Sequence, residues 1–98
     1  MAYRLSKRAD EDISAVLRDG FAKFGIDKTR AYFTDLKHTL DRIAKNPKIW
    51  REREELDQPA RVCRFKSHLI LYTVKADGTV WISRIRHSRE DWVSDPTE

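Results

Sequence analysis

The chain has 98 residues, of which 40% are hydrophobic and 37% are charged, and its formal net charge is +4. A chain of this length can bury one modest core, so we expect a single domain that spans residues 1–98. The hydrophobic content argues against intrinsic disorder, and the excess of positive charge favours an acidic partner, either nucleic acid or an acidic protein segment.

The sequence also argues against a membrane protein, a disulfide-stabilised protein and a metal-binding protein. No apolar run approaches the roughly 20 residues that span a bilayer, and the N-terminus lacks the apolar core of a secretory signal, so we expect a cytoplasmic protein with no membrane partner. Cys63 is the only cysteine, which excludes an intramolecular disulfide and favours a buried core thiol. No cysteine or histidine cluster has the spacing of a zinc site, and we expect neither a metal nor a cofactor.

The first predicted elements are a short strand and a helix. Residues 2–5 alternate apolar and polar, and Ser6 after them is suited to cap a helix. Beyond Ser6, apolar residues recur at steps of three and four and form one stripe: Ala9, Ile13, Val16, Leu17, Phe21 and Phe24. Gly25 ends this helix, because glycine readily adopts the left-handed conformation found at helix ends.

A second helix is predicted directly after the first, which gives a helical hairpin. Asp27 is suited to cap it, and Asn46-Pro47 ends it, since proline disfavours the helical conformation of the residue before it. Its apolar residues repeat the helical spacing: Ala31, Tyr32 or Phe33, Leu36, Leu40, Ile43 and Ala44. Both stripes need a common surface to cover, because helices of this length are marginal alone.

A charged connection over residues 48–59 follows the hairpin. We interpret it as a solvated segment that Ile49, Trp50 and Leu56 hold to the core. The alternative is a basic rim, which the glutamates between its lysine and arginine residues would partly neutralise.

Three strand-like runs come next, over residues 61–66, 68–74 and 79–86, with the hairpin-turn signal Asp77-Gly78 between the last two. The middle run is apolar on both faces, which indicates a central strand. Alternation in the last run places two sets on opposite faces: Val80, Ile82, Arg84 and Arg86, and Trp81, Ser83, Ile85 and His87. The predicted fold class is α+β with the order βααβββ, a mainly antiparallel sheet on which the N-terminal helical hairpin packs.

The last predicted strand passes directly into a polar tail, and together they carry candidate functional residues to a sheet edge. These are Arg84, Arg86, His87, Arg89, Asp91 and Trp92. One interpretation is the rim of a functional site. The other is a surface ion-pair network, with Trp92 covering the sheet edge, which contributes only about 0 to 1 kcal/mol per exposed pair.

Several blocks of residues follow a family pattern in order along the chain. They are Tyr3 to Ser6 with Ala9 and Asp12-Ile13, Phe24-Gly25 with Ala31-Tyr32 and Leu36, Ile43 to Pro47, Arg61, Ser67 to Tyr72, and Arg84 to His87 with Asp91-Trp92. As an ordered set these blocks resemble the ParE toxins of the RelE/ParE superfamily. The resemblance covers nearly the whole chain, and the fold it implies agrees with the βααβββ order.

The resemblance implies the toxin of a bacterial type II toxin–antitoxin system. Such toxins inhibit growth by binding DNA gyrase, support plasmid stabilisation, and are neutralised by a cognate ParD-like antitoxin. We then expect apolar surface on the unbound hairpin and a binding role for Arg61, Arg64, Arg84, Arg86, His87, Arg89, Asp91 and Trp92. Direct sequence-specific nucleic acid binding is not expected, because no helix-turn-helix or ribbon-helix-helix pattern is present.

RelE-like relatives on the same fold supply the alternative, a ribosome-dependent endoribonuclease that cuts mRNA without a metal. Such an enzyme needs a base, an acid and cations that stabilise the charged phosphorane. In this chain those parts could be taken by Arg64, Lys66, His68, Arg84 and His87. The lack of a tyrosine after the last strand, and the negative charge of Asp91, favour the gyrase inhibitor, for which no catalytic residue is expected.

Overall fold

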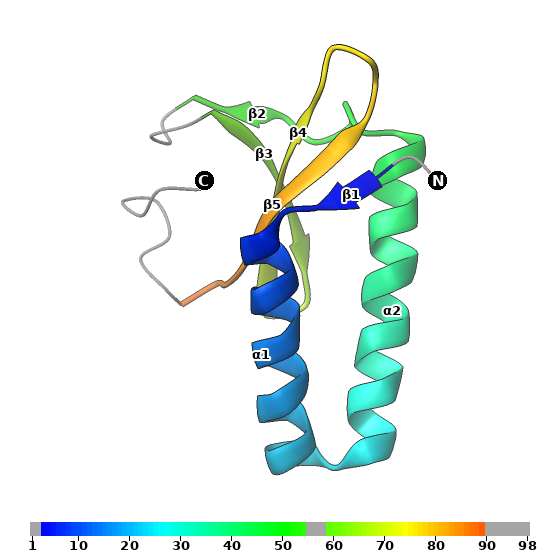
Figure 1. Cartoon of the computed structure of the whole chain (residues 1–98), viewed down its shortest axis with the longest axis vertical. Coiled ribbons are helices and arrows are strands. Elements are labelled where there is room, and N and C mark those ends of the chain that lie inside the picture. The colour runs from blue at the N-terminus through cyan, green and yellow to red at the C-terminus, as the bar shows by residue number, and fades with distance from the viewer. Residues whose placement is uncertain (1–2, 55–58, 90–98) are drawn as a thin grey trace.

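The computed structural model describes residues 3–54 and 59–89. Two helices and a mixed, mostly antiparallel sheet make an α+β fold, as predicted, with strand order β1-β5-β4-β3-β2 (Figure 1). The elements are β1 (Tyr3–Leu5), α1 (Lys7–Phe24), α2 (Ile26–Lys45), β2 (Glu52–Arg53), β3 (Ala60–Phe65), β4 (His68–Val74) and β5 (Val80–His87). None of the described helices is long and apolar enough to cross a membrane.

Ser6 joins the sheet to the first helix and confirms the predicted cap. Its side chain accepts a hydrogen bond from the Ala9 N–H at 2.9 Å and donates one to the Ser83 carbonyl at 2.8 Å. Its own N–H donates to the Ile82 carbonyl at 2.9 Å. These bonds continue the parallel pairing of β1 with β5, in which Leu5 lies opposite Ile82. The start of α1 is therefore fixed to the edge of β5.

The helical hairpin turns on one residue. Gly25 has a φ of 86°, in the left-handed region that glycine adopts without a steric penalty, and it separates α1 from α2. The prediction that Asp27 caps α2 is wrong: Asp27 lies inside the first turn, and Gly25 occupies the cap position. The Thr29 hydroxyl instead donates to the Gly25 carbonyl at 2.8 Å. A one-residue connection leaves no extended position for a separate cap.

The sheet has β4 at its centre, as predicted, and one irregularity that changes which residues share a face. Leu71 lies opposite Arg84 but Tyr72 lies opposite Ile82, so Ser83 is an extra residue in β5. The prediction that Arg84 shares a face with Val80 and Ile82 is therefore wrong. Past the bulge, Ile85 joins the main core, while Arg84 and Arg86 lie opposite Leu71 and Leu69 of a second cluster.

The main core fills the space between the hairpin and one face of the sheet. Its buried members are Ala9, Ile13, Leu36, Leu40, Ile43, Cys63, Phe65, Ile70, Tyr72, Val80, Ile82 and Ile85. A smaller cluster of Ala60, Leu69 and Leu71 occupies the other face. Cys63 is 2% exposed, which confirms the buried thiol, and burial raises its pKa.

The far end of the hairpin departs from the predicted stripes. Phe21 and Phe24 are 46% and 63% exposed, and Ala31 is exposed as well. Figure 1 shows the reason: the end of the hairpin that holds its connection extends past the strands, so the sheet does not cover it.

The charged connection contains a short strand that the sequence did not predict. β2 pairs antiparallel with the start of β3, where Glu52 lies opposite Arg61. Trp50 packs against the main core, as expected, but Ile49 is 68% exposed and does not hold the segment. Leu56 lies outside the described residues.

Candidate functional site

The predicted site residues do not gather in one place. Arg84 is 8% exposed and pairs with α1: its Nε and Nη2 lie 2.7 and 3.1 Å from the two carboxylate oxygens of Asp12. The Ile85 N–H donates to the same carboxylate at 2.9 Å. Arg84 therefore ties α1 to the edge of β5. Arg86 is also buried, at 7% exposure, opposite Leu69.

The basic residues of β3 have separate surroundings. Arg61 is half-buried, and its Nη1 donates to the Trp50 carbonyl at 2.7 Å. Arg64 is exposed, and its Nε donates to the Lys66 carbonyl at 3.2 Å. The Lys66 ammonium lies 2.9 Å from a carboxylate oxygen of Asp35. It also lies over the Tyr32 and Phe65 rings, 5.3 and 5.4 Å from their centroids. Arg61 and Lys66 therefore mainly make contacts that stabilise the fold.

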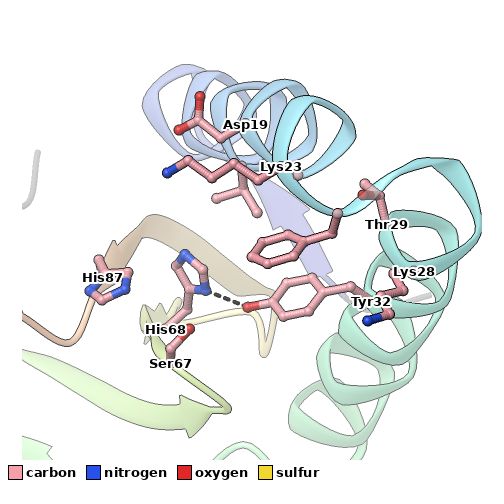
Figure 2. Close-up of a pocket in the computed structure, with 11 residues that line it drawn as sticks. Asp19, Lys23, Lys28, Thr29, Tyr32, Ser67, His68 and His87 are labelled. Carbon is pink, nitrogen blue, oxygen red and sulfur yellow. Dashed lines mark hydrogen bonds between the residues drawn. The ribbon is translucent and has the colours of Figure 1, made fainter.

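The two histidines, by contrast, lie together. Their ring centroids are 5.3 Å apart with the planes at 77°, and β4 and β5 place them directly opposite one another. The Tyr32 hydroxyl hydrogen-bonds to Nδ1 of His68. Figure 2 shows His68 between His87 and Tyr32. Burial raises the pKa of the Tyr32 hydroxyl, an effect that a hydrogen bond with Ser67 partly offsets.

The tail beyond β5 is described only at its start. Arg89 is exposed, and its N–H donates to Nδ1 of His87 at 3.1 Å. Asp91 and Trp92 lie outside the described residues. The predicted grouping of Arg84 with His87 is thus not formed, because Arg84 turns to α1 while His87 meets His68.

The histidine pair forms one wall of a cavity of about 440 Å³. The other walls come from the end of α1, the start of α2 and the turn between β3 and β4. The lining residues are Val16, Asp19, Gly20, Lys23, Phe24, Lys28, Thr29, Tyr32, Ser67, His68 and His87. The sequence did not identify Lys23 or Tyr32 as site residues. A tyrosine in an apolar stripe is a usable signal, since a buried hydroxyl needs a partner.

This arrangement has limited means for phosphoryl chemistry. His68, His87 and Tyr32 could exchange protons, but the predicted cations Arg64 and Arg84 have partners away from this cavity. Among residues 3–54 and 59–89, no group of three or more histidine, cysteine or acidic side chains could hold a metal ion.

A second surface feature lies at the free end of the hairpin. We call Phe21, Phe24 and Ile26 the hairpin-end patch; their exposures are 46%, 63% and 58%. Exposed lysines flank it, Lys23 before Gly25 and Lys28 after it. Three large apolar side chains so exposed on neighbouring turns indicate an interaction surface.

Comparison with known proteins identifies the family of this chain. Residues 3–92 match the model of the ParE toxin of the type II toxin–antitoxin system, parDE. Toxin ParE1 of Mycobacterium tuberculosis is 32% identical over 89 residues, 91% of either chain, and toxin ParE1 of Caulobacter vibrioides is 31% identical over 87% of this chain and 86% of its own.

A solved structure agrees on the fold. A chain of the chromosomal ParDE toxin–antitoxin system from P. aeruginosa superposes with a TM-score of 0.75 at 17% identity, over 89% of this chain and 95% of its own length. At that identity the likeness concerns the fold, and the family rests on the sequence matches. With those matches spanning both helices and all five strands, the chain belongs to the ParE toxins of type II toxin–antitoxin systems.

Proposed function

We propose that this toxin acts in the cytoplasm by binding and inhibiting DNA gyrase, and that a cognate ParD-like antitoxin neutralises it. The observation that carries the choice of inhibitor over nuclease is the Arg84–Asp12 pair, at 2.7 and 3.1 Å. A nuclease needs cations directed at the phosphorane, and this guanidinium is buried against a carboxylate instead. Inhibition by binding requires only a complementary surface.

The hairpin-end patch supports the antitoxin partner. A disordered segment that folds on binding can lay an amphipathic helix on exposed apolar side chains, and acidic residues beside its apolar face would meet Lys23 and Lys28. The solved relative from P. aeruginosa is described as a ParDE toxin–antitoxin system, which is consistent with such a pairing.

The sheet end supplies the proposed target contacts. Arg64 and Arg89 are exposed, while Arg61 and His87 are half-buried, so these four can meet an acidic partner. Asp91 and Trp92 remain in the proposal on the strength of the sequence alone. Arg84 and Arg86 support this end from within, since both are more than nine-tenths buried.

The alternative activity, cleavage of ribosome-bound mRNA, is favoured by one observation. His68, His87 and Tyr32 lie within one cluster, and histidine pairs can act as base and acid. Gyrase supercoiling and the integrity of ribosome-bound mRNA, measured with the same purified toxin, separate the two activities.

A gyrase supercoiling assay with antitoxin titration tests the proposal. We expect purified toxin to inhibit supercoiling or to trap cleaved DNA, to leave ribosome-bound mRNA intact, and to be reversed by the protein encoded beside it. Phe24→Glu should raise the antitoxin concentration needed for reversal about tenfold, because a charge replaces a central apolar contact.

The matched control is Ile49→Glu, which places the same charge on another exposed apolar residue, 68% accessible, outside the patch. It should titrate like the wild type. Cleaved mRNA with unaffected supercoiling would establish the nuclease, and equal titration of both variants would remove the patch from the antitoxin interface.

A further inference from the structure

The cavity between the hairpin and the sheet is lined by two chemically different kinds of side chain. Lys23, His68, His87 and Ser67 supply basic and hydroxyl groups, and Phe24, Tyr32 and Val16 supply aromatic and apolar surface. Its volume of about 440 Å³ lies within the range of small-molecule sites, roughly 300 to 1,000 Å³. Phe24, Lys23 and Lys28 belong to or flank the hairpin-end patch and His87 is a proposed target contact, but neither role requires the cavity itself.

The charge around the cavity favours an anion. Lys23, Lys28 and the two histidines face one acidic residue, Asp19, among the lining side chains. Asp19 lies four residues before Lys23 on the same face of α1, which is a weakly favourable spacing that offsets part of the lysine charge. Lys28 still leaves the net charge of the lining residues positive.

His68 is oriented for a ligand in this cavity. Its Nδ1 is held by the Tyr32 hydroxyl, and this fixes the ring on the cavity wall. Figure 2 shows the second ring nitrogen directed towards the side where Lys23 extends from α1. An ammonium and an imidazole nitrogen on opposite sides of one space can contact two oxygens of the same tetrahedral anion.

The aromatic part of the lining distinguishes among possible anions. A bare phosphate or a carboxylate would leave the Phe24 and Tyr32 rings without a contact, whereas a heterocyclic base can stack on such a ring. We propose that this cavity binds a nucleoside phosphate, whose phosphate meets Lys23 and His68 and whose base packs against Phe24. The ligand is either a free nucleotide or the phosphorylated end of a nucleic acid strand, since both present the same group.

Binding is tested by NMR and calorimetry on the purified full chain. The probes are adenosine 5′-monophosphate, adenosine, inorganic phosphate, and a short DNA oligonucleotide with and without a 5′-phosphate. We expect adenosine 5′-monophosphate to bind about tenfold more tightly than adenosine or phosphate alone. The ring resonances of His68 and His87 should shift, while those of His38, on an exposed part of α2, should not.

Two variants locate the site. Lys23→Gln should weaken the binding about tenfold, and Lys37→Gln, which removes the charge of another exposed lysine that lies over the Phe33 ring, should leave it unchanged. Lys23 is exposed, so its replacement leaves the fold intact.

The oligonucleotide arm identifies the source of the ligand. Preference for the 5′-phosphorylated strand over the free nucleotide assigns the site to strand ends, and the reverse assigns it to free nucleotides; either result supports the proposal. It is overturned if no phosphorylated probe shifts His68, if Lys23→Gln binds like the wild type, or if adenosine binds as tightly as adenosine 5′-monophosphate. No gyrase is present in this assay, so its outcome is independent of the proposed function.

Discussion

Asp12 is the residue on which the junction between α1 and β5 depends. Its carboxylate accepts from Nε and Nη2 of Arg84 and from the N–H of Ile85. It thereby pairs a buried cation and also satisfies a backbone donor beyond the point where β1 stops pairing with β5. Nη1 of Arg84 is buried with no hydrogen-bond partner among the described residues, so the pair leaves one donor nitrogen of the guanidinium unsatisfied.

We predict that Asp12→Asn lowers the free energy of unfolding by about 3 kcal/mol, because removing one partner of a buried ion pair leaves the other charge uncompensated. Denaturant titration of the two proteins measures the loss. The double variant Asp12→Asn, Arg84→Met should recover most of it, since the uncompensated charge is then gone. An equal loss in both variants would show that the uncompensated charge of Arg84 is not the cause of the destabilisation.

The candidate site shows what single residues reveal in the sequence and what they do not. His68 and His87 were expected among the site residues, and strand pairing places them opposite one another. The hydrogen bond of His68 with Tyr32 joins residues 36 positions apart, and no local sequence pattern spans that separation. Strand alternation extended past Ser83 places Arg84 on the face of Val80 and Ile82, and the bulge reverses that assignment.

At the scale of elements, the two helices are in close contact at Gly20. A methyl group built there would lie 2.9 Å from Thr29 Oγ1 and 3.1 Å from its Cγ2. Thr29 cannot easily turn away, because it is buried and its hydroxyl donates to the Gly25 carbonyl. Glycine at this position therefore sets the spacing of α1 and α2 beside the cavity.

Gly20→Ala should accordingly destabilise the protein by roughly 1 kcal/mol, because overpacking of about 1 to 3 kcal/mol outweighs the gain of up to about 1 kcal/mol in helix propensity. Thermal unfolding provides the measurement. In a Thr29→Ala background the clashing atoms are absent, and the same substitution should become neutral or stabilising. Additive effects of the two substitutions would contradict a close helix approach at this point.

Most element boundaries could be predicted because punctuating residues surround each periodic run. Ser6, Gly25 and Asn46-Pro47 delimit the helices, and the Asp77-Gly78 turn separates β4 from β5. β2 was missed because two residues are too few to show a period, and only Ala60 and Arg61 opposite them make Glu52–Arg53 a strand. The exposed end of the hairpin was missed because a stripe does not reveal how far the sheet beneath it extends.

At the scale of the whole molecule, Tyr72 connects the central strand to the segment that follows α2. Its side chain is fully buried in the main core, and its hydroxyl donates to the Pro47 carbonyl. Burial raises its pKa to about 12, while nearby Arg61 lowers it and Cys63 adds to the rise. The folded protein thus retains a proton that the unfolded chain releases at an ordinary pKa near 10.

The stability that Tyr72 contributes is therefore fully present below about pH 10 and is lost as the pH rises towards about 12. We predict a decrease of roughly 2 to 3 kcal/mol in the free energy of unfolding over this interval. Tyr72→Phe should lower stability by about 1 kcal/mol at neutral pH but show a weaker dependence above pH 10. Denaturation curves at fixed pH values provide the comparison, and identical alkaline slopes would refute this assignment.

The parallel pairing of β1 with β5 has a consequence for the folding of the toxin during its synthesis. Ser6 and Ser83 are 77 positions apart, yet their hydrogen bond lies at the junction where sheet and hairpin meet. Contacts so distant in sequence form late and slow the folding of small proteins. A nascent chain that still lacks β5 has no partner for β1 and no Ile85 or Arg84 for Asp12. Translation must therefore reach the last strand before any molecule can become harmful to its own cell.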